Sequence, residues 1–336
     1  MDHRIGLAAG YDPNMTPKDL ALAFRDAEER GFEAGFFSET IELVRDSVTS
    51  IATMGLGTER IVLGCTQIVR LRTPLVMAQT LAALDELTDG RMMLAPGACT
   101  HTHAKRHGLH RADPAQSLVE WVESIRLLLS GEKVSYHGEH VNFDDVQISF
   151  KPTRTDVPLF IPATSKKGLQ IAGRLGDGVM LNATCSPEYS ANAIAIVRQA
   201  AEEAGRDFSK FHIWQIVNTS VEDDHKKALD AIRWEIASKL DPIQLPFIIK
   251  PKKVVGEPYM HEEDIPKFEE AWARGGKQGL IEAVPDSYVE GLTASGTPDE
   301  VVARIQQYRD VGVQVPLLRP AAPHQFDRIL DLFAPK

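Results

Sequence analysis

Short runs of consecutive apolar residues alternate with amphipathic stretches from one end of the chain to the other. Most of these runs are apolar at every position rather than at alternate positions, which is typical of parallel strands covered on both faces. Eight such strands separated by helices make up a (β/α)8 barrel. We therefore predict an α/β fold of the TIM-barrel class. The predicted strands are residues 4–9, 34–38, 61–69, 92–94, 158–162, 179–182, 211–217 and 313–318.

The starts of the predicted helices share one dipeptide, in which Ser, Thr or Asp is followed by proline. It places a side-chain acceptor at the N-cap and proline in the first turn. Apolar residues then recur at helical spacing, and a glycine follows where the helix is expected to end. Because this unit repeats along the whole chain, we predict a single barrel domain over residues 1–336. The dipeptides are Thr16-Pro17, Thr73-Pro74, Asp113-Pro114, Ser186-Pro187 and Thr297-Pro298, and the glycines are Gly31, Gly90, Gly205 and Gly312.

Two segments interrupt this rhythm. Residues 134–150 are polar and are predicted to form a hairpin with Gly138 at its turn. Residues 241–295 are rich in proline, glycine and charge, and we expect them to be irregular. An insertion of that length usually forms a lid or carries function. Neither segment has the strand-rich core of a second domain.

The composition is that of an ordinary globular protein, with 43% hydrophobic and 25% charged residues, which excludes wholesale disorder. No apolar run reaches the roughly 18 residues of a membrane-spanning helix, and the first residues lack a signal-peptide pattern. We therefore expect neither membrane insertion nor secretion. The net charge of −10 argues against a general nucleic-acid binder. Cys65, Cys99 and Cys185 are odd in number and far apart, which predicts buried free thiols in a reducing, cytoplasmic compartment.

In a barrel of this class, the reacting groups stand at the C-terminal ends of the strands. The fifth strand is followed by Ala-Thr-Ser-Lys-Lys-Gly at residues 163–168, where a helix is expected to begin. Free backbone N–H groups, the positive end of the helix dipole and two ammonium groups together favour a phosphate. A solvated helix start with surface lysines is the alternative. The chain has no Gly-x-Gly-x-x-Gly sequence, which counts against a dinucleotide-binding Rossmann domain.

Two further strand ends carry titratable side chains. His101 and His103 follow the fourth strand, and a His-x-His pair there could bind zinc or iron. Later strand ends lack the remaining ligands, and the eighth offers Arg319, so we expect no metal site and place His103 beside an organic ligand. Glu39 is the one carboxylate directly at an early strand end. It could transfer a proton or bind a cofactor ring, or be paired with a neighbouring arginine.

Several longer motifs resemble the bacterial-luciferase-like family of flavin- and deazaflavin-dependent oxidoreductases, and the resemblance covers nearly the whole chain. Two motifs look most like its branch of methylenetetrahydromethanopterin reductases, which use the deazaflavin coenzyme F420. The family motifs are residues 63–67, 73–75, 84–91, 171–179 and 296–301, and the branch motifs are 182–188 and 284–289.

This resemblance implies where a cofactor would bind. Its ring would lie across the strand ends, its phosphate would lie at the start of the helix after the fifth strand, and a cis peptide would join Thr66 and Gln67. Many deazaflavin-dependent members have Asp-His at the second strand end, where this chain has Glu39-Thr40. Glu39 and His103 are therefore the catalytic candidates. The cofactor-binding candidates are Ser38, Glu39, Thr66, Gln67, His103, Ala163, Thr164, Ser165 and Lys166.

The leading hypothesis is hydride transfer between F420 and a small organic substrate at the C-terminal face of the barrel, closed over by part of residues 241–295. Lys250, Lys252 and Lys253 in that segment could meet an acidic group or be plain surface charge. An FMN-dependent monooxygenase supplied by a partner reductase is the nearest alternative. A metallohydrolase using His101 and His103, and a cofactor-free binding protein, are two others. The resemblance also implies a homodimer; the sequence does not name the substrate.

Overall fold

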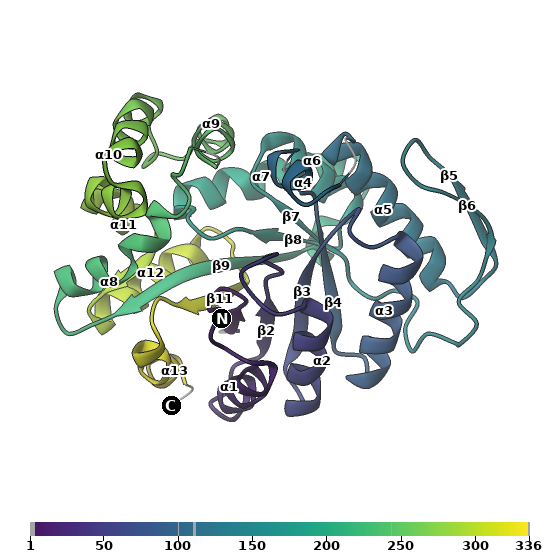
Figure 1. Ribbon diagram of the computed structural model, residues 1–336. Coiled ribbons are helices and arrows are strands. Elements are labelled where there is room, and N and C mark those ends of the chain that lie inside the picture. The colour runs from purple at the N-terminus through teal and green to yellow at the C-terminus, as the bar shows by residue number, and fades with distance from the viewer. Residues whose placement is uncertain (1–3, 100, 110–111, 243, 335–336) are drawn as a thin grey trace.

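The computed structural model describes residues 4–99, 101–109, 112–242 and 244–334. Eight parallel strands form a nearly closed barrel with helices outside it, so the predicted fold class is confirmed (Figure 1). A bridge between Leu94 and Leu159 joins the first and last strands of the series. In spatial order the strands are β4 (Met92–Gly97), β3 (Val62–Ile68), β2 (Ala34–Phe37), β1 (Gly6–Ala9), β11 (Val315–Pro320), β9 (His212–Val221), β8 (Gly178–Leu181) and β7 (Phe160–Ala163).

Each of the eight predicted apolar runs coincides with a barrel strand. A ninth short strand, β10 (Ala294–Gly296), pairs with the end of β9 and was not predicted. The helices are α1 (Pro17–Glu29), α2 (Ser47–Gly57), α3 (Pro74–Leu87), α4 (His101–Arg106), α5 (Pro114–Leu129), α6 (Lys166–Leu175), α7 (Pro187–Glu203), α8 (His225–Ala237), α9 (Leu245–Val255), α10 (Ile265–Ala283), α11 (Asp286–Leu292), α12 (Pro298–Asp310) and α13 (Phe326–Phe333), with 3-10 turns at Phe208–Lys210, Glu262–Asp264 and Pro323–Gln325.

The predicted capping signals mark real helix ends. Each of the five Ser/Thr/Asp-Pro dipeptides begins a helix, with proline in its first turn. The four predicted stop glycines all have positive φ, between 71° and 107°. An L-residue with a side chain adopts that conformation only under strain, so glycine is the residue that lets the chain leave each helix cheaply.

Alternate strand residues fill the barrel and pack against the helices. Phe36, Met93, Trp214 and Leu317 belong to the inner cluster, while the neighbouring positions contribute to the larger cluster under the helices. The rings of Phe160 and Trp214 meet edge to face, with centroids 5.2 Å apart. The interior is therefore a packed core, and free space begins near the C-terminal ends of the strands.

The first insertion is a hairpin, as predicted. β5 (Val134–His137) and β6 (Asn142–Val146) pair antiparallel. The Glu120 carboxylate on α5 accepts backbone N–H groups from Glu139, His140 and Val141 at 2.7–2.9 Å. One buried side chain thus fixes the turn onto the barrel helices.

The prediction that residues 241–295 are irregular is wrong, because they form α9, α10 and α11. The prolines at positions 246 and 266 stand in the first turns of α9 and α10, where a missing N–H costs no helical hydrogen bond. Apolar residues at helical spacing then pack with α8 into a second hydrophobic cluster that includes Ile236, Ile249 and Phe268. Figure 1 shows these helices (green) grouped at one end of the molecule.

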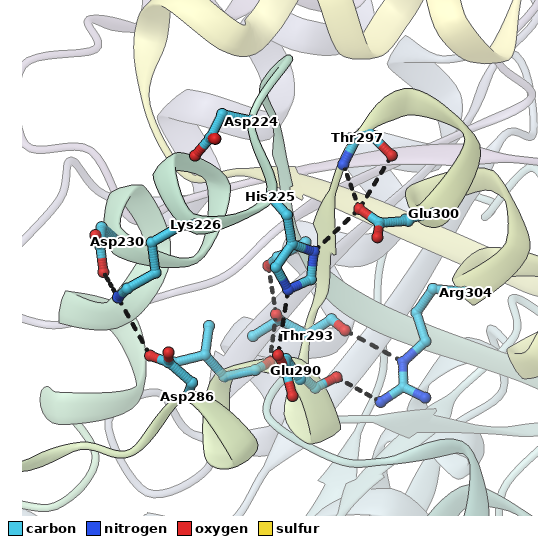
Figure 2. A network of polar contacts seen from close by, with 12 residues as sticks. Asp224, His225, Lys226, Asp230, Asp286, Glu290, Thr293, Thr297, Glu300 and Arg304 are labelled. Carbon is cyan, nitrogen blue, oxygen red and sulfur yellow. Dashed lines mark hydrogen bonds and ion pairs between the residues drawn. The ribbon is translucent and has the colours of Figure 1, made fainter.

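His225 joins this helical insertion to the barrel helices. Its Nδ1 lies 3.0 Å from Glu300 on α12, and its Nε2 lies 3.2 Å from Glu290 on α11 (Figure 2). Lys226 beside it donates to Asp230 at 2.6 Å and to Asp286 at 3.3 Å. The hydrogen bonds to Glu300 and then Glu290 raise the pKa of His225.

A raised pKa in the folded state makes protonated His225 stabilising. The contribution is complete below the unfolded-state pKa of about 6.5 and is lost as pH rises through the folded-state pKa. We predict that His225→Gln removes about 0.5 kcal/mol of unfolding free energy at pH 5.5, since the site is partly exposed, and less at pH 8.5. Urea denaturation at both pH values measures this. An equal loss at the two pH values would contradict it.

Candidate active site

A pocket of about 420 Å³ opens at the C-terminal ends of the strands. Every barrel strand supplies at least one lining residue, in the strand itself or just after it. One from each, taken from β1 to β11 along the chain, is Tyr11, Ser38, Thr66, Gly97, Thr164, Asn182, Ile216 and Arg319.

The structure brings together most of the residues predicted to bind a cofactor. Ser38, Glu39, Thr66, Ala163 and Thr164 all line this pocket. Three other predicted residues are not among its lining residues, for different reasons. The side chain of Gln67 points away because its neighbours Thr66 and Ile68 point in, Ser165 caps α6, and Lys166 is exposed on that helix.

His103 lies in α4, but its side chain falls outside the part of the chain that the structure describes, as does that of His101. Among the described residues, no group of three His, Cys, Asp or Glu side chains is placed to hold a metal ion. Cys65, Cys99 and Cys185 are free and buried, as predicted.

Glu39 is fully engaged by its neighbours. Its Oε1 accepts from Arg72 and from Ser47, each at 2.7 Å, and its Oε2 accepts the backbone N–H of Ile68 at 2.7 Å. The carboxylate is 8% exposed. Of the two interpretations that the sequence allowed, the structure has the ion pair with an arginine, and this pair fastens the end of β2 to the end of β3.

The ends of β1 and β2 are also fastened together. Tyr11 donates its hydroxyl hydrogen to Ser38 Oγ at 2.6 Å, and Thr40 donates to the carbonyl of Gly10 at 3.2 Å. Gly10 has φ of 97°, and a Cβ there would lie 2.2 Å from the carbonyl oxygen of Ser38. Only glycine permits this close approach of the two strand ends.

The expected cis peptide between Thr66 and Gln67 is absent, as are cis bonds elsewhere in the described ranges. Both residues continue β3 in regular parallel pairing with Ala95 and Pro96 of β4. A trans peptide is compatible with this regular pairing and avoids the cost of about 3 kcal/mol that a non-prolyl cis bond carries.

The start of α6 forms as the sequence predicts. Ser165 is its N-cap and accepts the backbone N–H of Gly168 at 3.2 Å. Tyr189 on α7 donates to the carbonyl of Thr164 at 2.8 Å, which fixes the last residue before the cap. The first-turn N–H groups of a helix lack intrahelical acceptors, so this end of α6 offers donors to an anion beside the pocket.

Residues of α9 and of the turn before it, called the α9 roof below, line one part of the pocket. The sequence predicted only some of them. Lys239, Gln244, Ile248 and Lys252 line the pocket from α9 and the turn before it. Lys252 is 1% exposed, and its Nζ donates to the carbonyl of Thr184 and, at 3.3 Å, to the Thr184 hydroxyl. The sequence did contain a signal that Lys252 is buried. Lys252 follows the buried Leu245 and Ile249 at helical spacing, so it lies on the apolar face of α9. Lys250 and Lys253, the other two lysines considered, are exposed.

Arg319, at the end of β11, also lines the pocket and is bonded to α8. Its guanidinium forms an ion pair with Glu235 on α8 and stacks over the ring of Tyr11, 3.6 Å from the centroid. Arg319 and Glu235 are 4% and 5% exposed. Such a buried, stacked guanidinium has one fixed geometry.

Comparison with known proteins decides the family. The sequence profile described as luciferase-like monooxygenase matches residues 3–315 of this chain. The chain belongs to the luciferase-like family.

Relatives of this luciferase-like chain extend over nearly its full length. It is 28% identical over 322 residues to a 5,10-methylenetetrahydromethanopterin reductase of Archaeoglobus fulgidus, covering 93% of each chain. It is 27% identical over 345 residues to an F420-dependent glucose-6-phosphate dehydrogenase of Nakamurella multipartita, covering 98% of this chain and 94% of the other. The family and these named relatives make the protein an oxidoreductase.

Several solved enzyme structures have the same fold. The F420-dependent tetrahydromethanopterin reductase of Methanopyrus kandleri superimposes with a TM-score of 0.85 at 22% identity, covering 98% of this chain and 97% of the other. An F420-dependent secondary alcohol dehydrogenase has a TM-score of 0.81 at 21% identity, covering 99% and 98%. A type II Baeyer-Villiger monooxygenase from Pseudomonas putida with FMN has 0.71 at 15% identity, covering 99% and 97%. At these identities the likeness confirms the barrel fold.

The Glu39–Arg72 pair gives this luciferase-like site a stability test. We predict that Glu39→Gln and Arg72→Met each cost about 2 kcal/mol of unfolding free energy. Arg72→Met leaves the largely buried Glu39 charge without a cation, and Glu39→Gln leaves Arg72 only its second ion pair, with the exposed Asp46. The double variant should cost less than the sum, with a coupling energy of about 1 kcal/mol.

Urea denaturation of the two single variants and the double variant measures that coupling. Arg106→Gln is a matched control, since it breaks the exposed pair with Glu42 and should cost less than about 0.5 kcal/mol. Strict additivity of Glu39→Gln and Arg72→Met would show that the pair does not hold the strand ends.

Proposed function

We propose that the protein is an F420-dependent oxidoreductase that transfers a hydride between the cofactor and a small organic substrate in the pocket at the C-terminal face of the barrel. One observation carries the proposal. Ser38, Thr66, Ala163 and Thr164, which stand at the ends of three strands, β2, β3 and β7, converge on one pocket of about 420 Å³. The F420-dependent relatives named above support the choice of cofactor. When bound, F420 supplies or accepts the hydride.

The residues present suit a flat, polar-edged ring with a phosphate tail. Pro162, Met180 and Ile216 contribute apolar lining to the pocket, and Ser38 and Thr66 contribute hydroxyl groups. The start of α6, with the Ser165 cap, is placed beside Thr164 for a phosphate. The volume is within the range of small-molecule sites in proteins.

The protein's own residues would orient the reactants and exclude water. Tyr11 fixes the hydroxyl of Ser38, and the Glu39–Arg72 pair fixes the rim next to it. The α9 roof, held to the end of β8 by Lys252, covers the pocket and limits access of water to a reacting pair. Holding donor and acceptor in one geometry is a large part of such catalysis.

We assign proton transfer from the hydrogen bonds that the candidate groups already make. Glu39 accepts three hydrogen bonds, so we assign it a positioning role. Thr40 donates to a backbone carbonyl and has no useful titration near neutral pH. His103, predicted beside the ligand, is therefore the candidate for proton transfer where a reaction needs it.

FMN is the competing cofactor, because the family profile is described as luciferase-like monooxygenase and a Baeyer-Villiger monooxygenase of the same fold has been solved with FMN. Titration with each cofactor separates the two functions. We predict that F420 binds tightly with a change in its fluorescence and that FMN binds far more weakly. Tight FMN binding without affinity for F420 would contradict the proposal and favour the monooxygenase.

The phosphate position has its own test. We predict that Lys166→Gln weakens F420 binding about two- to fivefold, because it removes a positive charge at the N-terminus of α6. Lys210→Gln is the matched control, since Lys210 is exposed on a different turn and should bind F420 as the unmodified protein does. Equal affinities of the two variants would place the phosphate elsewhere.

A further inference from the structure

Three cations share one side of the pocket. Lys239, Lys252 and Arg319 all line it, in a chain whose net charge is −10. Glu235, Glu257 and Asp241, the carboxylates that act on these cations, do not line the pocket. Glu39 does line it, but its charge is paired with Arg72. A cavity wall of one sign of charge concentrates ligands of the opposite sign.

Arg319 has an unused donor. Glu235 accepts a hydrogen bond from Nη2 of Arg319, and the ring of Tyr11 stacks against the guanidinium plane. Nη1, however, is buried and has no hydrogen-bond partner among the described residues. Buried polar atoms are paired in the great majority of cases, because an unpaired donor loses its hydration without compensation. A guanidinium fixed on two sides with a free N–H is arranged to bind a further acceptor.

Asn218 shows the same feature next to Arg319. The two residues are paired in register on β9 and β11, and Asn218 is 1% exposed. It faces the barrel interior, because Trp214 and Ile216, four and two residues before it on the strand, belong to the inner cluster. Neither its amide nitrogen nor its amide oxygen has a partner in the described ranges. Two neighbouring buried side chains thus hold unused hydrogen-bonding groups at the mouth of the barrel.

Lys239 and Lys252 add positive charge to the same wall as Arg319. Lys239 is half-buried, and burial, followed by the charge of Arg319, lowers its pKa. A lysine in that position is stabilised in its charged form by any anion that enters. Lys252 already donates to Thr184, so it contributes its charge to the wall while it holds α9 in place.

The start of α6 cannot account for these groups. That helix begins after β7, whereas Arg319 and Asn218 stand on β11 and β9, and β8 separates β7 from β9. A cofactor phosphate at Ser165 would therefore leave the Arg319 donor unused.

We propose that Arg319, with Lys239 and Lys252 beside it, binds an oxyanion of the substrate, either a carboxylate or a phosphate. This inference rests on the proposed function, which puts the substrate in this pocket, and it extends that function to a substrate class. The substrate is an organic anion whose charged group lies on the β9–β11 side, away from the start of α6.

Calorimetric titration of the cofactor-free protein with inorganic phosphate and with acetate tests the subsite. Lys239→Gln should weaken binding about tenfold, as expected for the loss of one charge-assisted contact. The double variant Arg319→Met/Glu235→Met should abolish measurable binding. It replaces both members of the buried pair by apolar side chains, which usually preserves folding better than removal of one. Lys253→Gln, an exposed change on α9, is the control and should bind both probes unchanged.

The two probes distinguish the two sources of charge: tighter phosphate binding indicates a phosphate ester, and tighter acetate binding a carboxylate. Unchanged binding of both probes in Lys239→Gln, or a loss seen only in Lys166→Gln, would overturn the proposal. Should the double variant not fold, Lys239→Gln decides alone. F420 titration of the same proteins tests the proposed function separately. The anion subsite is measured without the cofactor, so its presence or absence does not depend on whether the protein binds F420.

Discussion

Closure of the parallel barrel is the constraint on which the rest of the structure depends. Because the eight strands run in one direction and the bridge between Leu94 and Leu159 joins the two ends of the series, all carboxyl ends meet at one rim. Residues that are more than 300 positions apart, such as Tyr11 and Arg319, then stack directly. The packed interior below them leaves the rim as the place where polar groups and free space meet.

Two buried ion pairs give this rim its shape. Glu39 and Arg72 connect the ends of β2 and β3 on one side, and Glu235 connects Arg319 to α8 on the other. Buried pairs contribute little net stability against apolar replacements, but they fix geometry because each charge needs its partner. The site is thus held by interactions that specify positions rather than by extra hydrophobic burial.

Local signals in the sequence predicted most of the fold. Pairs such as Thr73-Pro74 and stops such as Gly90 act within a few residues, so their structural outcome can be predicted from neighbours alone. The helices of residues 241–295 were missed because the segment is rich in proline, glycine and charge. The prolines at positions 246 and 266 nevertheless stand in first helical turns, and Pro251 lies within α9. Composition alone does not show where along a helix a proline stands.

The candidate site was predictable only as far as strand ends could be found. Ser38, Thr66 and Thr164 were named from the family resemblance, which places a cofactor across the strand ends that a parallel barrel brings together. The partner of Glu39 lies 33 residues away, and Lys252 meets Thr184 across 68 residues, so nothing in the local pattern pairs them. Contacts of this kind depend on tertiary packing, which single-sequence patterns do not encode.

Hydrogen–deuterium exchange with and without F420 tests the central claim most directly. If the strand-end pocket holds the cofactor, F420 should slow exchange at the ends of β2 and β3, at the start of α6 around Ser165, and in the α9 roof. Backbone amides of the β5–β6 hairpin, which supplies no lining residue, should exchange unchanged. Protection confined to other surfaces, or none at saturating F420, would contradict the account.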